Sequence, residues 1–220
     1  MPFESTEDAV RAWVHGWVVS RGAAEPSDRS WGFTVDVGHS REVARHVLTS
    51  ADEATVRRLA ESSPGGVALK VFVPAPVLEA WLPPGWGLLD GHDSLMAVSL
   101  GHVGAAPVLP DGYRLSSWHR GGVTRVLVRA ADGGFAARGQ IAVTGTTAAV
   151  DQVETDPAHQ RRGLGRVVMR TLARTGAQQG ARAAVLGATA EGRALYESVG
   201  WRVLAPLSAA ALRTPEGGTD

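Results

Sequence analysis

Apolar and polar positions recur along this chain in two rhythms, one typical of helices and one typical of strands. Residues 7–20 place large apolar side chains at the three- and four-residue spacing of a single helix face, which predicts an amphipathic helix. These side chains are Val10, Trp13, Val14, Trp17 and Val18. From Trp31 the stretch "WGFTVDVG" changes to a two-residue alternation rich in β-formers, which predicts a strand. The intervening residues 21–30 are rich in glycine, proline and serine and predict a loop.

The remainder of the first half predicts short elements. Residues 41–48 and 52–61 both favour helices, and Ser50 or Asp52 could cap the second one. Two strands are expected over 67–73 and 94–100, and one further helix over 77–82.

A stretch rich in glycine and proline, Gly101–Gly112, lacks either rhythm and divides the sequence. We therefore expect an N-terminal α/β region over residues 1–104 and a second domain over 105–220. The second half then predicts a meander of strands followed by strands alternating with helices. Strands are expected over 113–118, 123–129, 135–143, 148–155, 181–187 and 201–204, and helices over 164–178 and 191–199. The fold class is therefore mixed α/β, and the final residues 214–220 are expected to be disordered.

Composition and charge narrow the class of protein. The 220 residues are 44% apolar and carry 22 basic and 22 acidic side chains, so no global charge favours nucleic acid or a membrane surface. The absence of cysteine excludes disulfides, thiolate metal sites and an acyl-cysteine intermediate. No stretch of 18 apolar residues occurs, and the first residues do not form a secretory signal. We expect a cytoplasmic protein.

The stretch "DPAHQRRGLGRVVMR", which begins at Asp156, holds the strongest functional signal. It leads from a predicted strand into a helix that begins near Gly163. The first amides of a helix are unpaired and form the positive end of its dipole, and glycines at 163 and 165 let an anion approach them closely. Arg161, Arg162 and Arg166 add positive charge. These features predict a site for a phosphate or diphosphate.

Two common phosphate loops fit this stretch poorly. The dinucleotide fingerprint needs a third glycine, which would fall at Val168, so an oxidoreductase of that type is disfavoured. The phosphate loop of nucleotide triphosphatases needs Gly-Lys-Ser/Thr, which does not occur.

The segment Gln160-Arg161-Arg162-Gly163-Leu164-Gly165 instead resembles the acyl-CoA loop of the GNAT N-acetyltransferase superfamily, Gln/Arg-x-x-Gly-x-Gly/Ala. "VLGATAEGRALYESVGW", about 25 residues later, resembles the family's later strand and helix. The resemblance covers roughly residues 123–204 and implies transfer of an acetyl group from acetyl-CoA to an amine of a small molecule or peptide. Direct attack in a ternary complex is expected.

The resemblance also implies functional residues. Tyr196 aligns with the general acid, and the backbone near Val153 would stabilise the thioester oxygen. For the base we choose Glu154 over Asp151, because we expect the two to point to opposite faces of their strand; a base acting through water stays open. The expected contacts to acetyl-CoA come from Val153, Thr155, Gln160, Arg161, Arg162, Gly163, Leu164, Gly165, Arg166 and Thr189.

The sequence departs from the family pattern in two places. Thr189 stands where an asparagine is common, and two helices that usually follow the first strand have no room between Trp118 and Phe135. The first half could supply the missing wall, so the acceptor is expected to bind between the halves, and the first half could be a diverged copy of the same fold.

Other functions and partners follow from the same residues. The alternative to an enzyme is an acyl-CoA-binding sensor or interaction module without catalysis. The seven histidines have no metal-ligand spacing, so no metal is expected. We expect no nucleic-acid or membrane partner, and a homodimer stays open.

Overall fold

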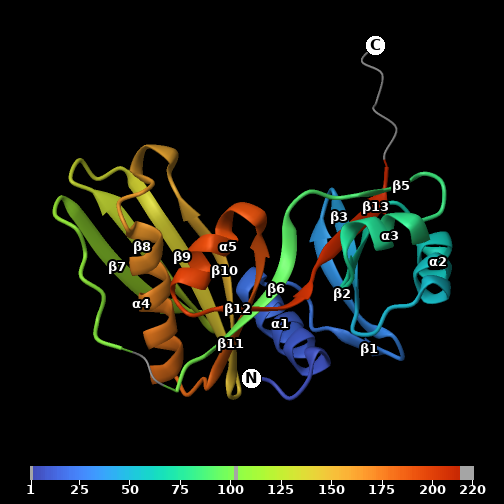
Figure 1. Ribbon diagram of the computed structural model, residues 1–220, viewed down its shortest axis with the longest axis horizontal. Coiled ribbons are helices and arrows are strands. Elements are labelled where there is room, and N and C mark those ends of the chain that lie inside the picture. Colours follow the sequence, from blue (N-terminus) through green and yellow to red (C-terminus); the bar gives the residue numbers. More distant parts are fainter. Residues whose placement is uncertain (1, 102–103, 214–220) are drawn as a thin grey trace, which may run out of the picture.

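The computed structural model describes residues 2–101 and 104–213 and contains two mixed β-sheets that lie side by side (Figure 1). The first part of the chain forms α1 (Thr6–Arg21), β1 (Ser27–Arg29), β2 (Gly32–His39), β3 (Glu42–Leu48), α2 (Glu53–Ser62), β4 (Val67–Val71), α3 (Ala75–Trp81), β5 (Trp86–Leu88) and β6 (His92–Ser99). The second part forms β7 (Tyr113–Arg120), β8 (Val123–Ala130), β9 (Phe135–Thr144), β10 (Thr147–Thr155), a 3-10 turn (Pro157–His159), α4 (Leu164–Gln178), β11 (Ala183–Thr189), α5 (Ala190–Ser198), β12 (Arg202–Pro206) and β13 (Ser208–Leu212).

The two sheets share an arrangement of six strands, to which β7 adds a seventh in the second sheet, and they exchange a strand. Their orders are β1-β2-β3-β4-β13-β5 and β7-β8-β9-β10-β11-β6-β12. In each, a helix connects one parallel pair, β3 with β4 through α2 and β10 with β11 through α4. A second helix and a short strand follow each pair: α3 and β5 in the first sheet, and α5 and β12 in the second. Between β4 and β5, and likewise between β11 and β12, lies a strand from the other part of the chain. β6 fills the slot in the second sheet and β13 the slot in the first, so their connections run in opposite directions (Figure 1).

The division expected at residues 104 and 105 does not coincide with the division between the sheets. It falls between β6 and β7, which belong to the same sheet, and β13 from the end of the chain completes the other one. The repeated topology gives the first half the strand arrangement of a second copy of the same fold.

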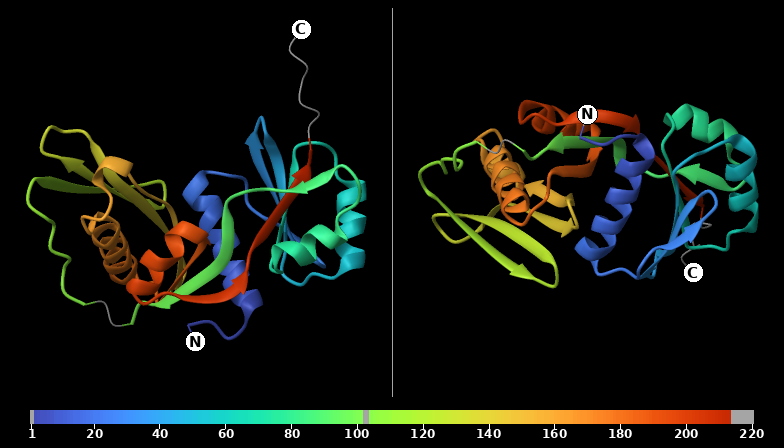
Figure 2. Two further views of the ribbon diagram at one scale, coloured as in Figure 1. Left: turned by 45° about the horizontal axis from the view of Figure 1, so that its top comes forward. Right: turned by 90° about the horizontal axis from the view of Figure 1, so that it is seen from below.

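Helix α1 lies between the two sheets (Figure 2). Its apolar face packs with Phe33 and Val47 of the first sheet and with Ala149 and Val185 of the second. A Cβ at Gly16 would clash with Ala149, so this glycine lets the helix approach β10 closely. Helix α4 covers the opposite face of the second sheet, while α2 and α3 cover the outer face of the first.

The sequence patterns located most elements, with one error of type. Of the two residues that could cap the helix over 52–61, Asp52 does so and accepts a hydrogen bond from the Thr55 amide at 2.9 Å. Residues 41–48, however, form strand β3 instead of the predicted helix. The pairing of β3 with β2 and β4 overrides the local preference of this arginine- and glutamate-containing stretch. Strands β1, β5 and β13 were not predicted, and the expected disorder over 214–220 lies outside the described residues.

Lys70, the only lysine, is buried in the middle of the first sheet at 8% exposure. Its pKa is lowered to about 8, mainly by burial and also by the nearby positive charge of Arg45, while the negative charge of Glu42 opposes the shift. The folded state therefore releases this proton at a lower pH than the unfolded chain does, and the free energy of unfolding should rise between about pH 8 and pH 10.5.

Substitution Lys70→Met is expected to raise the free energy of unfolding at pH 7 by roughly 1–3 kcal/mol, because it removes a buried charge. The gain should shrink at pH 10, where Lys70 of the wild type has lost its proton. Urea unfolding at both pH values measures the difference, and Arg182→Met, at an exposed cation, is the control. An unchanged gain at pH 10 would show that lysine ionisation is not its cause.

Candidate active site

A cleft opens in the second sheet where two parallel strands separate. β10 pairs with β11 only from Thr147 to Ala149, and beyond these residues the strands diverge. The resulting cleft has a volume of about 910 Å³ and is bounded by the end of β10, the loop before α4, the end of β11 and α5. The edge of β10 facing β11 thus has backbone groups open to the cleft.

The first turn of α4 forms one end of this cleft. Gly163 precedes the helix with φ of +79°, a left-handed conformation that glycine adopts without strain. In the described part of the chain no side chain caps α4, whereas Ser5, Asp52 and Thr189 cap α1, α2 and α5. The amides at the start of α4 are therefore available to an anion.

Gly165 has a different role in the fold. A Cβ at this position would lie 2.7 Å from Cδ2 of Leu195 and 3.6 Å from Oγ1 of Thr155. The glycine therefore lets α5 pack closely against the mouth of α4. By contrast, a Cβ at Gly163 would meet open space.

The three arginines of the loop are arranged differently. Arg161 and Arg166 border the cleft, and Arg166 donates a hydrogen bond to Ser198 Oγ at 3.4 Å. Arg162 is not among the residues that line the cleft; it donates to the Tyr113 hydroxyl at 3.1 Å and to the carbonyl of Ala158 at 3.3 Å. Two of the three guanidinium groups are thus placed to contact a ligand.

The other predicted contact residues border the cleft. Val153, Thr155, Gln160, Gly163, Leu164, Gly165 and Thr189 all line it. Leu164 has a buried side chain, so it can offer a ligand only its backbone. Thr189 Oγ1 accepts the Gly192 amide at 3.1 Å, which leaves its hydroxyl hydrogen available to donate.

The two candidate bases do not point to opposite faces, contrary to our expectation. Asp151 pairs with Gln140 and Glu154 pairs with Arg138. The two β10 residues are three positions apart in sequence, whereas their β9 partners are two apart, so β10 contains one extra residue. This β-bulge, in which Gln152 has φ of +52°, restores the two carboxylates to one face. Both border the cleft.

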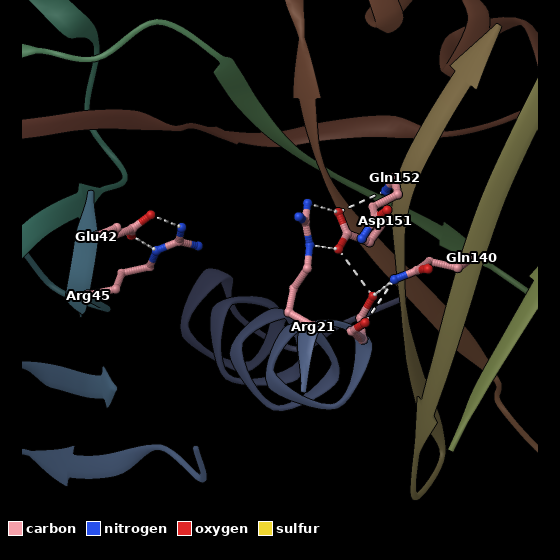
Figure 3. Close-up of polar contacts among 7 residues, drawn as sticks. Arg21, Glu42, Arg45, Gln140, Asp151 and Gln152 are labelled. Carbon is pink, nitrogen blue, oxygen red and sulfur yellow. Dashed lines mark hydrogen bonds and ion pairs between the residues drawn. The ribbon is translucent and has the colours of Figure 1, made fainter. Parts of the chain in front are cut away.

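Asp151 is held by the end of α1 (Figure 3). It forms an ion pair with Arg21 and accepts hydrogen bonds from Ser20 Oγ at 3.1 Å and from the Gln152 amide at 2.8 Å. Gln140 donates to the Ser20 carbonyl at 2.8 Å. Sequence reasoning missed Arg21, since no local pattern links the end of the first helix to a strand 130 residues away.

Glu154 has a more exposed environment. It pairs with Arg138 at 2.8 Å, and both side chains are about half exposed. Such an exposed pair contributes little to stability.

Tyr196 of α5 lies at the other end of the cleft and is 8% exposed. Burial raises its pKa to about 12, and the negative charge of Asp151 acts in the same direction. Its hydroxyl therefore stays protonated at neutral pH. The arrangement thus joins an anion site, an open strand edge, a phenol and two carboxylates around one cleft.

Among residues 2–101 and 104–213 no cluster of three or more histidine and acidic side chains could hold a metal ion. No helix in the same ranges is long and apolar enough to cross a membrane.

Comparisons with known proteins agree with this geometry. The family model described as acetyltransferase (GNAT) family matches residues 105–201. A search of curated proteins finds no match. Among solved structures, a GCN5-related N-acetyltransferase from Kribbella flavida has a TM-score of 0.68 at 15% identity over 98% of both chains.

Two other structures show the same likeness. A protein from Novosphingobium aromaticivorans, assigned to the GNAT family, has a TM-score of 0.59 at 18% identity over 97% of this chain and 100% of its own. A tandem GNAT protein from the clavulanic acid biosynthesis pathway has a TM-score of 0.54 at 13% identity, over 68% of this chain and 65% of its own. At these identities the likeness establishes the fold. The acetyltransferase (GNAT) family model thus matches the residues that build the loop and line the cleft, apart from Arg21 of α1.

Proposed function

We propose that this protein is an N-acetyltransferase that uses acetyl-CoA to acetylate a primary amine of a small molecule or peptide. The observation that carries the proposal is the uncapped, glycine-led start of α4 at one end of a cleft whose other end holds Tyr196. One end suits the diphosphate of the donor and the other suits its thioester.

The donor would be held mainly by backbone. The amides that open α4 would bind the diphosphate, with Arg161 and Arg166 adding charge beside them. Thr155, Gln160 and Thr189 border the path from there to Tyr196. Along this path the open edge of β10 offers donors and acceptors to the amides of the pantetheine arm, as a neighbouring strand would.

The reaction is a direct transfer. The amine nitrogen attacks the thioester carbonyl, a C–N bond forms, and the C–S bond breaks with the electron pair leaving on sulfur. The backbone amide of Val153 is the proposed donor to the carbonyl oxygen as it gains charge.

Two side chains would act on the amine proton and on the departing sulfur. Glu154, directly or through a water, would take the proton that leaves the nitrogen. Tyr196 would donate a hydrogen bond to the departing sulfur, and the thiolate would then take a proton from solvent. Because its pKa is about 12, above the roughly 8.5 of an alkyl thiol, its main contribution is a hydrogen bond that stabilises the thiolate.

The first sheet would bind no second molecule of acetyl-CoA. Helix α2 occupies the topological position of α4, but the Asp52 carboxylate caps its first turn and would repel a phosphate. Its half of the chain is therefore proposed to have a structural role, with α1 supplying Arg21 to the cleft.

The proposal is tested by measuring thiol release from acetyl-CoA with a panel of amines, amino acids, aminoglycosides and short peptides. An acetyltransferase should release one thiol for each amine acetylated, with the product identified by mass spectrometry. Calorimetric binding of acetyl-CoA without release for any amine would instead indicate a non-catalytic acyl-CoA sensor.

Substitution Gly165→Val is expected to weaken acetyl-CoA binding at least about tenfold, because a branched side chain would stand at the amides that hold the diphosphate. The new Cβ would also lie 2.7 Å from Cδ2 of Leu195 and disturb the packing of α5. The double variant Gly165→Val/Leu195→Ala separates the two effects, since it restores space but keeps the obstruction. Thermal unfolding should recover in the double variant and calorimetric affinity should not; joint recovery would assign Gly165 a packing role alone.

Substitution Tyr196→Phe is expected to lower kcat roughly a hundredfold while changing acetyl-CoA affinity little, because it removes only the proposed donor to sulfur. Tyr113→Phe is the matched control, since the Tyr113 hydroxyl contacts His159 and Arg162 outside the cleft. The pKa of Tyr196 is about 12, so any loss of wild-type activity below about pH 11 should have another cause. Full turnover by Tyr196→Phe would remove its role in the reaction.

A further inference from the structure

A second hollow adjoins the cleft on the face of the sheet turned away from α4. It has a volume of about 610 Å³ and shares Gln152 and Glu154 with the cleft. Side chains alternate along β8, and Val126 and Val128 pack in the core beneath α4. Arg125, which directly precedes Val126, therefore points to the other face. We name this hollow the side groove; Trp118, Arg125, Phe135 and Arg138 line it.

The register of four strands connects the side groove to the reaction centre. Trp118 of β7 pairs with Arg125 of β8, Arg125 with Gln140 of β9, and Gln140 with Asp151 of β10. Directly paired residues point to one face, so these side chains form a row across the sheet. With strands about 4.8 Å apart, Arg125 lies roughly 10 Å from the position of Asp151.

Arg125 carries the electrostatic argument. It is partly buried, and among the described residues no carboxylate forms an ion pair with it. The neighbouring Arg138, by contrast, is already paired with Glu154. A partly desolvated guanidinium without a counter-charge favours binding of an anion, and its planar fork matches a carboxylate.

The aromatic side chains add a second preference. Trp118 is 45% exposed and Phe135 is 37% exposed, although both are large and apolar. Their presence beside Arg125 in one hollow suits a ligand with a planar or apolar part next to its carboxylate.

We propose that the side groove is the acceptor subsite and that it selects an amine whose far end carries a carboxylate and an apolar ring. Arg125 binds the carboxylate, Trp118 and Phe135 contact the ring, and the nitrogen reaches the cleft beside Glu154. This inference rests on the proposed acetyltransferase activity and specifies its acceptor. Glu154 pairs with Arg138, two residues along β9 from Gln140, so its backbone lies roughly 12 Å from that of Arg125. This distance corresponds to between three and four extended residues, so a tripeptide such as Gly-Gly-Phe, together with the length of the two side chains, can span it.

The experiment compares Gly-Gly-Phe with its C-terminal amide as acceptors, in the wild-type protein and in Arg125→Gln. Arg129→Gln is the matched control, since Arg129 is an exposed arginine on the same strand that does not line the groove. In the wild type and in the control, kcat/KM should be about tenfold or more higher for the acid than for the amide. In Arg125→Gln the two peptides should become equal, mainly through a higher KM for the acid.

Calorimetry separates this inference from the proposed function. Binding of both peptides is measured with CoA present, so the preference for the carboxylate can be observed even without turnover. Suppose that the protein acetylates amines but shows no preference for the free acid over the amide, either in kcat/KM or in binding. The inference is then wrong and the proposed function stands. If Arg125→Gln keeps the preference, Arg125 is not its source and the assignment is likewise overturned; thermal unfolding confirms that each variant is folded.

Discussion

The separation of β10 from β11 is the constraint on which the rest of this structure depends. Two parallel strands that part after three residue pairs expose backbone donors and acceptors that a continuous sheet would satisfy. The surrounding structure holds the gap open: a bulge bends β10 away, α4 and α5 close the far ends, and the glycine at 165 lets those helices meet. The cleft is therefore a feature of the sheet itself, and its chemistry follows from the groups that border it.

Helix α1 connects this cleft to the first sheet through two arginines. Arg21 leaves the end of the helix to pair with Asp151 on β10, and Arg45 of β3 places its guanidinium 4.1 Å from the ring centre of Trp17, one turn earlier on the same helix. Arg45 in turn pairs with Glu42 (Figure 3). Asp151, whose charge also bears on the pKa of Tyr196, is thus held by a helix that packs against both sheets.

The sequence predicts the second half well because its signals are local. The helix expected over 164–178 has those bounds, and the loop was identified from glycines and arginines within six residues of one another. The helix expected over 41–48 was wrong because strand pairing with two partners decides that segment. The faces of Asp151 and Glu154 were also wrong, since one extra residue at Gln152 reverses the alternation and no sequence signal marks such a bulge. The side groove depends on the register of four strands, which the sequence alone does not specify.

The exchange of β6 and β13 has a consequence for how the protein is made. The slot between β4 and β5 is formed by residues 67–88 but is filled by residues 208–212. During synthesis the first sheet therefore lacks a central strand until residues 208–212 have emerged from the ribosome. The first sheet cannot be completed before the second half of the chain is made, so both halves are expected to reach their final form together, after residues 208–212 have been synthesised.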